Sequence, residues 1–394
     1  MGFIMKRKKI NIAHNLMGCR LDNWLDLLKH NPISKENRPQ VLFMTVVIAF
    51  LAIPGFFEKL LYDPKIKKTK LKKDPVYIVG FWRSGTTYLQ NLLTRDPQFA
   101  WFDPVNTVTF NNSILLGDFL SKIMNKLLEN ARPMDNLDYT MDLPMEEVFA
   151  QATISEQAIA HMLVFPDGGK GVKYIETAFI DEQKPKKRRE WRKAYDYLLR
   201  KITYIKGQKQ LILKSPENTC RIGELKRCYP HAKFINIYRD PYAVILSTIN
   251  MFNKEMSQFC LNKPASPQFI ENTAINLFAR VYKKAIKELE AMDPKDRVDI
   301  RYEDFCKDPK GYVKEIYDRF GIGGYEEALP HFEAYLDSQK NYKKNHFELN
   351  DRLRKKINRK LKFYFDYYGY EMIGAAEKAP AKSAQGMQLQ TNPN

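Results

Sequence analysis

The sequence predicts an α/β protein in which a central parallel sheet is flanked by helices. Short runs of apolar and β-branched residues, typical of buried strands, occur at residues 76–79, 211–214, 234–238 and 298–302. Segments with apolar residues at helical spacing separate these runs, so strands alternate with helices along the chain. This alternation favours a parallel sheet with right-handed crossover connections.

Composition limits the partners that the chain can have. With 394 residues it can bury a large core, either as one α/β domain with appendages or as two domains. Lys and Arg outnumber Asp and Glu by 64 to 46, which favours an anionic partner: a phosphorylated cofactor, an acidic membrane surface or nucleic acid. No stretch resembles a nucleic-acid-binding module. We therefore expect no nucleic-acid partner.

Cysteine and histidine usage indicates the compartment and the absence of a metal site. The five cysteines are scattered and contain no CxxC pair, which is typical of a reducing compartment and argues against a disulfide framework. The six histidines show no HExxH spacing. We therefore expect a cytoplasmic protein without a metal site.

Residues 1–74 form a basic and hydrophobic region with helical character. A helix is predicted around residues 21–30, and residues 41–57 contain no charge. This uncharged stretch is at the lower limit for spanning a bilayer, and Pro54-Gly55 interrupts its end. Lysine-rich residues 65–73 follow, and they suit anionic headgroups.

Three interpretations of residues 41–57 remain open. The segment is a single-pass anchor, a membrane-surface or re-entrant helix, or a helix that is buried or binds a partner. No cleavable signal pattern precedes it. We expect association with the cytoplasmic face of an anionic membrane.

A predicted anion-binding loop follows. Residues 76–95 read VYIVGFWRSGTTYLQNLLTR, which predicts a strand, a glycine turn and a helix. Backbone N–H groups at a helix start can hold an anion, because they lack helical acceptors and lie at the positive end of the helix dipole. Gly80 and Gly85 have the GxxxxG spacing of nucleotide-binding loops, but Thr-Thr replaces the usual Lys-[Ser/Thr]. The pattern favours an anion other than a magnesium triphosphate, held by Arg83, Ser84, Gly85, Thr86 and Thr87.

Two carboxylates, Glu146 and Glu147, open a predicted helix. Acidic residues in a first turn are explained by the helix dipole alone. One of them could also accept a proton from a substrate hydroxyl. Helices are further predicted at residues 113–130 and 184–204, the second of which starts with a basic run that is typical of a solvated face.

Two cations end predicted strands. Lys214 closes the strand at 211–214, and Arg239 follows the strand at 234–238. Ligands of parallel sheets bind outside the carboxyl ends of the strands, where the loop at Arg83 also lies. Ser247 comes eight residues after Arg239, at a spacing that lets both converge on one phosphate.

These motifs carry a family resemblance that covers about residues 75–369. Residues 83–87, RSGTT, resemble the 5′-phosphosulfate loop of sulfotransferases, which use 3′-phosphoadenosine 5′-phosphosulfate (PAPS). Arg239 with Ser247 resembles the pair that binds the 3′-phosphate of PAPS in that family. The resemblance implies a three-layer α/β/α fold related to P-loop nucleoside kinases. It also implies in-line sulfonate transfer to a hydroxyl of a carbohydrate, glycolipid or lipid, without a metal.

The resemblance also suggests catalytic residues. Lys214 resembles the lysine that closes on the transferred sulfonate, and Arg83 would stabilise the same charge. Pro216 stands where cytosolic members of the family have a histidine base. This departure leaves Glu146 or Glu147 as the candidate base, with Glu217 and Asp103 as weaker candidates.

Two other functions remain open: a nucleotide-dependent kinase or NTPase, and a catalytically inactive, membrane-attached nucleotide-binding scaffold. The N-terminal region resembles that of a group of bacterial sulfotransferase-like proteins. We expect residues 1–74 to be the membrane-associated region, 75–373 the catalytic domain and 374–394 a disordered tail. A basic loop at Lys343, Lys344 and His346 could close over the nucleotide, although a surface loop is the simpler interpretation.

Overall fold

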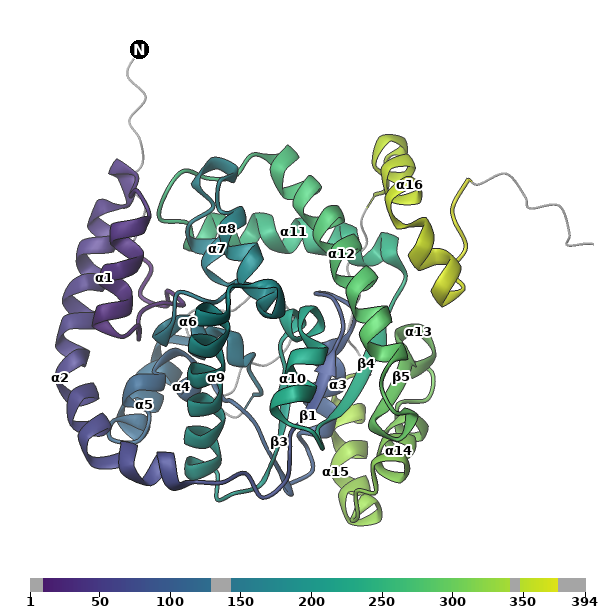
Figure 1. Ribbon diagram of the computed structural model, residues 1–394, viewed down its shortest axis with the longest axis horizontal. Coiled ribbons are helices and arrows are strands. Elements are labelled where there is room, and N and C mark those ends of the chain that lie inside the picture. The colour runs from purple at the N-terminus through teal and green to yellow at the C-terminus, as the bar shows by residue number, and fades with distance from the viewer. Residues whose placement is uncertain (1–9, 129–142, 341–347, 375–394) are drawn as a thin grey trace, which may run out of the picture.

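A five-stranded parallel sheet forms the centre of the protein (Figure 1). The computed structural model describes residues 10–128, 143–340 and 348–374, so the predicted tail and the basic loop at Lys343 lie outside the described residues. All strand pairs are parallel, in the order β2-β3-β1-β4-β5. The strands are β1 (Val76–Val79), β2 (Phe99–Ala100), β3 (Gln210–Lys214), β4 (Lys233–Tyr238) and β5 (Arg297–Arg301).

The described α-helices cover both faces of the sheet and extend beyond it. They are α1 (Leu21–His30), α2 (Arg38–Lys68), α3 (Thr86–Leu93), α4 (Pro104–Val108), α5 (Gly117–Leu128), α6 (Glu147–Ile154), α7 (His161–Val164), α8 (Val172–Ile175), α9 (Pro185–Ile205), α10 (Ile222–Cys228), α11 (Pro241–Phe259), α12 (Pro267–Glu290), α13 (Tyr302–Phe305), α14 (Pro309–Phe320), α15 (Tyr325–Ser338) and α16 (Asp351–Tyr368).

Alternating side chains of the strands build two cores, one on each face of the sheet. Tyr77 and Val79 of β1 pack with residues of α9, α10 and the end of α12. Val76 and Ile78 point to the other face and pack with residues of α3, α14 and α15. Because successive residues of a strand face opposite sides, one strand contributes to both cores. The predicted three-layer α/β/α fold is confirmed.

The register places the loops after three strands at one edge of the sheet. Ile78 of β1 lies beside Lys214, the last residue of β3, and Val79 lies beside Asn236 of β4. The chain then leaves β1 at Gly80 and leaves β4 just before Arg239. The loop at Arg83, Lys214 and Arg239 therefore meet at the carboxyl edge.

Two elements differ from the sequence-based expectations. β2 has only two residues and is not among the predicted strands. Its pairing with β3 is non-local and leaves no pattern in so short a segment. α2 continues through Pro54-Gly55, which was expected to interrupt it. A proline inside a helix costs a hydrogen bond, but buried residues on both sides of it, Ile48 and Glu58, fix this helix to the body.

The N-terminal helices are bound to the rest of the protein by polar contacts. Trp24 Nε1 of α1 donates to Thr45 Oγ1 of α2 at 2.9 Å. Lys201 of α9 and Glu58 of α2 form an ion pair at 2.5 Å, with side chains only 2% and 3% exposed. Lys201 Nζ also donates to the Phe110 carbonyl. Glu58 thus connects α2 to α9 through a buried charge pair.

Lys201→Ala is expected to destabilise the protein by about 3–5 kcal/mol, because it leaves the buried Glu58 carboxylate without a cation. Urea unfolding followed by circular dichroism measures this change. The double variant Glu58→Gln/Lys201→Met is the control and should recover most of the loss, since neither charge remains. A single variant as stable as the wild type would contradict this role.

Candidate active site

The loop between β1 and α3 adopts a conformation that requires its glycines. Gly85 has φ 96°, and a Cβ at this position would lie 2.2 Å from Cδ2 of the Tyr302 ring. A Cβ on Gly80 would lie 2.4 Å from the Ile237 carbonyl oxygen. Arg83 also has a positive φ, 69°, which is uncommon for a residue with a side chain. The GxxxxG spacing therefore reflects close packing against β4 and α13.

The donors of the loop begin one residue later than expected. The Ser84 N–H donates to the Phe81 carbonyl at 3.1 Å, which closes a turn. Gly85 is the N-cap of α3, and the first N–H groups of a helix have no acceptor within it. The backbone N–H groups that have no acceptor within α3 therefore begin at Gly85.

Two residues that the sequence did not single out, Thr219 and Tyr282, hold the backbone of the loop in place. The Gly80 N–H donates to Thr219 Oγ1 at 2.8 Å, and the same hydroxyl donates to the Gly80 carbonyl at 3.1 Å. The Phe81 N–H donates to the Tyr282 hydroxyl at 3.3 Å. Thr219 lies in the 3-10 segment η6 (Pro216–Cys220) after β3, so the chain after Lys214 supports the loop after β1.

Lys214 joins three elements at one point. Its Nζ lies 2.6 Å from Glu146 Oε1 and donates to Thr87 Oγ1 at 3.2 Å. Glu146 is the N-cap residue of α6, Thr87 is in the first turn of α3, and Lys214 ends β3. The Glu146 side chain is 19% exposed and that of Lys214 4%. The structure therefore brings together a cation, a carboxylate and a hydroxyl that the sequence singled out.

Glu147 lies in a different environment from Glu146. It is fully buried, and its Oε1 accepts from Asn218 Nδ2 at 2.5 Å and from the Tyr195 hydroxyl at 3.0 Å. These contacts bind the start of α6 to η6 and α9. Among the described hydrogen bonds, Glu146 and not Glu147 contacts Lys214.

The two weaker candidate bases have structural partners. Glu217 forms an ion pair with Arg221 at 2.9 Å, and both side chains are 1% exposed. Burial raises the pKa of Glu217 to about 8, although Arg221 opposes the shift. Asp103 caps α4 by accepting from the Asn106 N–H and pairs with Lys206 at 2.6 Å.

Arg83, Arg239 and Ser247 form a second group. Arg83 Nε donates to Ser247 Oγ at 2.9 Å, and Arg239 Nη1 donates to the Arg83 carbonyl at 3.1 Å. The Arg239 guanidinium lies 4.2 Å from the centre of the Tyr302 ring. Tyr364 of α16 accepts from the Arg239 N–H and donates to the Arg239 carbonyl. In this structure the Arg83 side chain therefore lies with Ser247 and Arg239.

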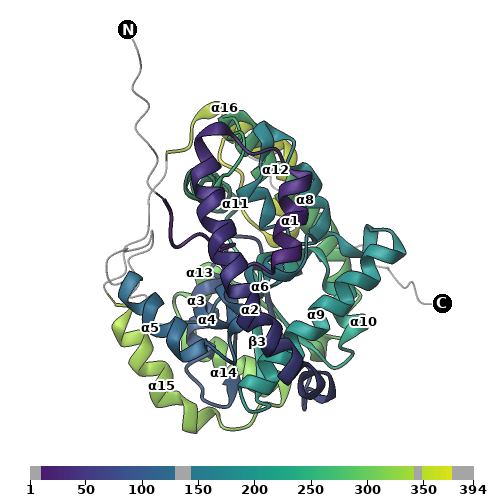
Figure 2. The same ribbon diagram turned by 90° about the vertical axis from the view of Figure 1, so that its left-hand side faces the viewer.

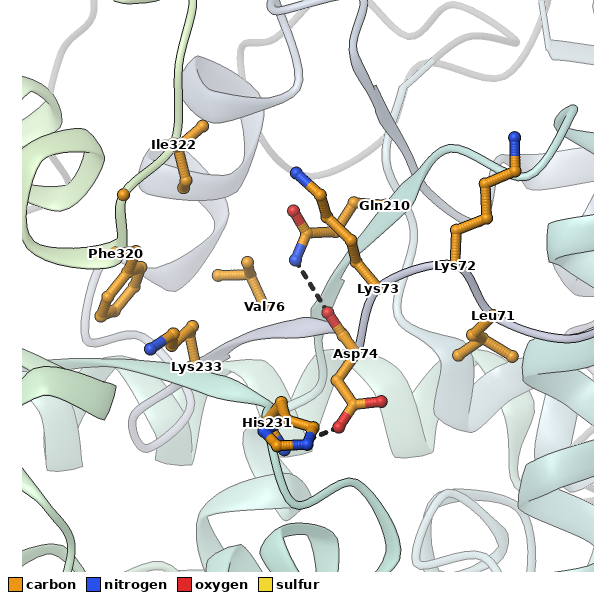
Figure 3. A pocket seen from close by; sticks show the side chains of 11 residues that line it. Leu71, Lys72, Lys73, Asp74, Val76, Gln210, His231, Lys233, Phe320 and Ile322 are labelled. Carbon is orange, nitrogen blue, oxygen red and sulfur yellow. Dashed lines mark hydrogen bonds between the residues drawn. The ribbon is translucent and has the colours of Figure 1, made fainter.

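A cavity of about 580 Å³ lies at the opposite edge of the sheet, where β1, β3 and β4 begin (Figure 3). Ligands of open parallel sheets bind at the carboxyl edge, which argues against this cavity as the active site. Some of its polar groups are also engaged: Asp74 accepts from Gln210 Nε2 through its carbonyl and from the backbone N–H of His231 through its carboxylate (Figure 3).

The fold and the site together define a class of protein. An all-parallel sheet, a glycine-containing loop that leads from its central strand into a helix, and cations at two further strand ends are features of P-loop-like α/β proteins. The lysine of a triphosphate-binding loop is missing from the sequence.

The comparisons with known proteins specify the family. The model of the sulfotransferase family matches residues 75–327, so the chain belongs to this family and is a sulfotransferase. It is 27% identical over 359 residues to the omega-hydroxy-beta-dihydromenaquinone-9 sulfotransferase Stf3 of Mycobacterium bovis, covering 90% of this chain and 91% of that protein. The Stf3 of Mycobacterium tuberculosis matches with the same identity and coverage.

Solved structures share the fold. Sulfotransferase STF9 from Mycobacterium avium has a TM-score of 0.65 at 15% identity, covering 91% of this chain and 98% of that one. Sulfotransferase STF1 from Mycobacterium tuberculosis has a TM-score of 0.61 at 17% identity, covering 88% and 94%. Both structures match a larger share of this chain than the family model does.

Proposed function

We propose that this sulfotransferase transfers the sulfonate group of PAPS to a hydroxyl carried by a lipid. The observation that carries the proposal is the position of Lys214 Nζ, between the Glu146 carboxylate and the Thr87 hydroxyl at the start of α3. Of the expected acceptors, carbohydrate, glycolipid and lipid, the relative Stf3 favours a lipid, because its name specifies a hydroxylated menaquinone.

The residues at the carboxyl edge fit the two ends of PAPS. Gly85 packs against the Tyr302 ring at the start of α3. The N–H groups of the first turn of α3 can then bind a 5′-phosphosulfate. Arg239 and Ser247 offer a guanidinium and a hydroxyl to the 3′-phosphate, and Arg83 lies against both. When bound, PAPS supplies a sulfonate on a good leaving group, the 5′-phosphate.

Glu146 is the proposed general base. It takes the proton of the acceptor hydroxyl as the hydroxyl oxygen bonds to sulfur and the bond from sulfur to the 5′-phosphate oxygen breaks. The products are a sulfate ester and 3′,5′-adenosine bisphosphate. Lys214 orients the carboxylate and, with Thr87, stabilises the charge that develops on the transferred group. Positioning and electrostatics supply most of the catalysis, as in phosphoryl transfer.

Glu147 is proposed to position Glu146. Its buried contacts with Asn218 and Tyr195 fix the first turn of α6, and the Val148 N–H donates to Ser215 Oγ beside Lys214.

We further propose that the enzyme works at the cytoplasmic face of a membrane, where both PAPS and a lipid acceptor are accessible.

Sulfur-labelled PAPS with a hydroxylated quinol lipid tests this function, and the same lipid without the hydroxyl is the control. Label should pass only to the hydroxylated lipid, and a parallel panel of phenols and soluble carbohydrates should stay unlabelled. Binding of nucleotide without transfer to any acceptor would contradict the proposal and favour an inactive scaffold.

A further inference from the structure

We infer that α2 and α5 form a docking face on which the protein lies on the surface of an anionic bilayer, with α2 parallel to the membrane. The α2–α5 face consists of two apolar stripes: Leu42, Val46, Phe50, Ile53, Phe57 and Leu60 of α2, and Leu115, Phe119 and Ile123 beside and within α5. The inference rests on the proposed function for the choice of a lipid surface as partner.

The α2 stripe is an exposed, one-sided apolar surface. Its six side chains are 50–72% exposed and recur every three or four residues, so they share one side of the helix. The stripe is about 27 Å long at 1.5 Å per residue. Soluble proteins rarely leave so much contiguous apolar surface in water. Figure 2 looks onto the side of the molecule on which α2 lies, with α5 near its lower half.

The opposite side of α2 is fixed to the protein. Met44 and Ile48 are fully buried, Thr45 accepts from Trp24, and Glu58 pairs with Lys201. A helix that crosses a bilayer exposes its whole circumference to lipid or to other spanning helices. Spanning would separate these contacts and expose the Glu58 charge. Of the three interpretations of residues 41–57, the structure therefore favours the membrane-surface helix.

Glu58 also links the buried side of α2 to the start of α5. Its Oε2 accepts from the N–H groups of Ile114 and Leu115 at 2.9 and 2.8 Å, so the chain enters α5 directly beside α2. Leu115, Phe119 and Ile123 follow at four-residue intervals and are 38–61% exposed. α5 thus presents further exposed apolar side chains close to the point at which α2 is bound to the body.

Charge selects an anionic surface as the partner. Both acids of residues 38–73, Glu58 and Asp63, are buried, and the Asp63 carboxylate accepts from the Tyr197 hydroxyl at 2.8 Å. All exposed charges of the same segment are basic: Arg38, Lys59, Lys65, Lys67, Lys68, Lys70, Lys72 and Lys73. An apolar stripe that ends in a cluster of lysines matches the interface of a membrane with negative headgroups.

Vesicle sedimentation with the full chain, without PAPS or acceptor, tests the docking face. Wild type should bind vesicles of phosphatidylcholine mixed with phosphatidylglycerol, bind pure phosphatidylcholine more weakly, and lose affinity as salt rises. Phe50→Gln/Phe57→Gln should weaken binding by about tenfold or more, because two aromatic side chains no longer enter the lipid. The control Ile373→Gln removes another exposed apolar side chain, which follows α16, and should bind like wild type; in Figure 1, α16 lies on the opposite side of the molecule from α2.

Other outcomes would overturn the inference. Equal binding by the double variant, or no binding of wild type to anionic vesicles, would show that the face does not dock on lipid. A wild-type dimer that the double variant converts to a monomer would make the face a protein interface. Resistance of the bound wild type to alkaline extraction would indicate a spanning helix. Binding of 3′,5′-adenosine bisphosphate by the double variant confirms that it is folded. Because that binding is independent of lipid, failure of the docking face and failure of the proposed function are distinguishable.

Discussion

Lys214→Ala is expected to lower kcat by about 10²–10³-fold or more, the range for removing one donor that stabilises transition-state charge. Lys214 Nζ contacts both Thr87 and Glu146, so the variant loses the cation and also the partner that orients the carboxylate. Affinity for 3′,5′-adenosine bisphosphate should change little, because Arg239 and Ser247 remain. Steady-state turnover and calorimetry on the same preparation separate the two effects.

Lys206→Ala is the matched control for this experiment. Lys206 pairs with Asp103 at the same 2.6 Å that separates Lys214 from Glu146, but its partner caps α4. It should keep nearly full turnover. If Lys214→Ala retained turnover similar to that of Lys206→Ala, the assignment of Lys214 to the reacting end would be wrong.

Glu146→Gln is expected to lower kcat by about 10²–10⁴-fold, the usual contribution of a general base. The amide keeps the size of the side chain but cannot accept the proton of the acceptor hydroxyl. KM for the acceptor should change far less than kcat, which separates loss of the base from loss of binding.

Glu147→Gln is the matched control, one residue further along α6. Its amide oxygen can still accept from Asn218 and Tyr195, so the start of α6 should keep its position and turnover should stay within about tenfold of wild type. Equal loss in both variants would remove the distinction between base and positioning residue. Greater loss in Glu147→Gln would make Glu147 the base.

Local sequence patterns predicted the frame of the site. The strands ending at Val79, Lys214 and Tyr238 each have an apolar run followed by a turn or a charged residue, and parallel pairing then places their ends at one edge. The anion-binding loop is likewise local, since two glycines and a helix start define it. The fold and the approximate place of the site therefore follow from short stretches of sequence.

The arrangement within the site depends on contacts between distant residues. Nothing in the sequence near Glu146 and Glu147 indicates that one faces Lys214 while the other is buried beneath it, because the difference arises from packing against η6 and α9. Thr219 supports Gly80 across 139 positions. The ring of Tyr302 leaves no room for a side chain at Gly85. The sequence predicted Tyr302 as the last residue of a strand, but β5 ends at Arg301 and Tyr302 begins α13.

The N-terminal region shows the same limit. Its length and lack of charge allowed both a spanning and a surface helix. The distinction depends on Glu58, whose partner Lys201 lies 143 positions away in α9. An acid that follows a long apolar run is therefore informative only when its partner is known.

The most direct test of the central claim is calorimetric binding of 3′,5′-adenosine bisphosphate, compared with ATP and magnesium, to wild type and to Arg239→Ala. We predict that wild type prefers the bisphosphate and that Arg239→Ala loses about tenfold or more of this affinity, because a charge-assisted contact to the 3′-phosphate is removed. Preference for ATP with magnesium, or an unchanged affinity in Arg239→Ala, would contradict a PAPS site at this edge of the sheet.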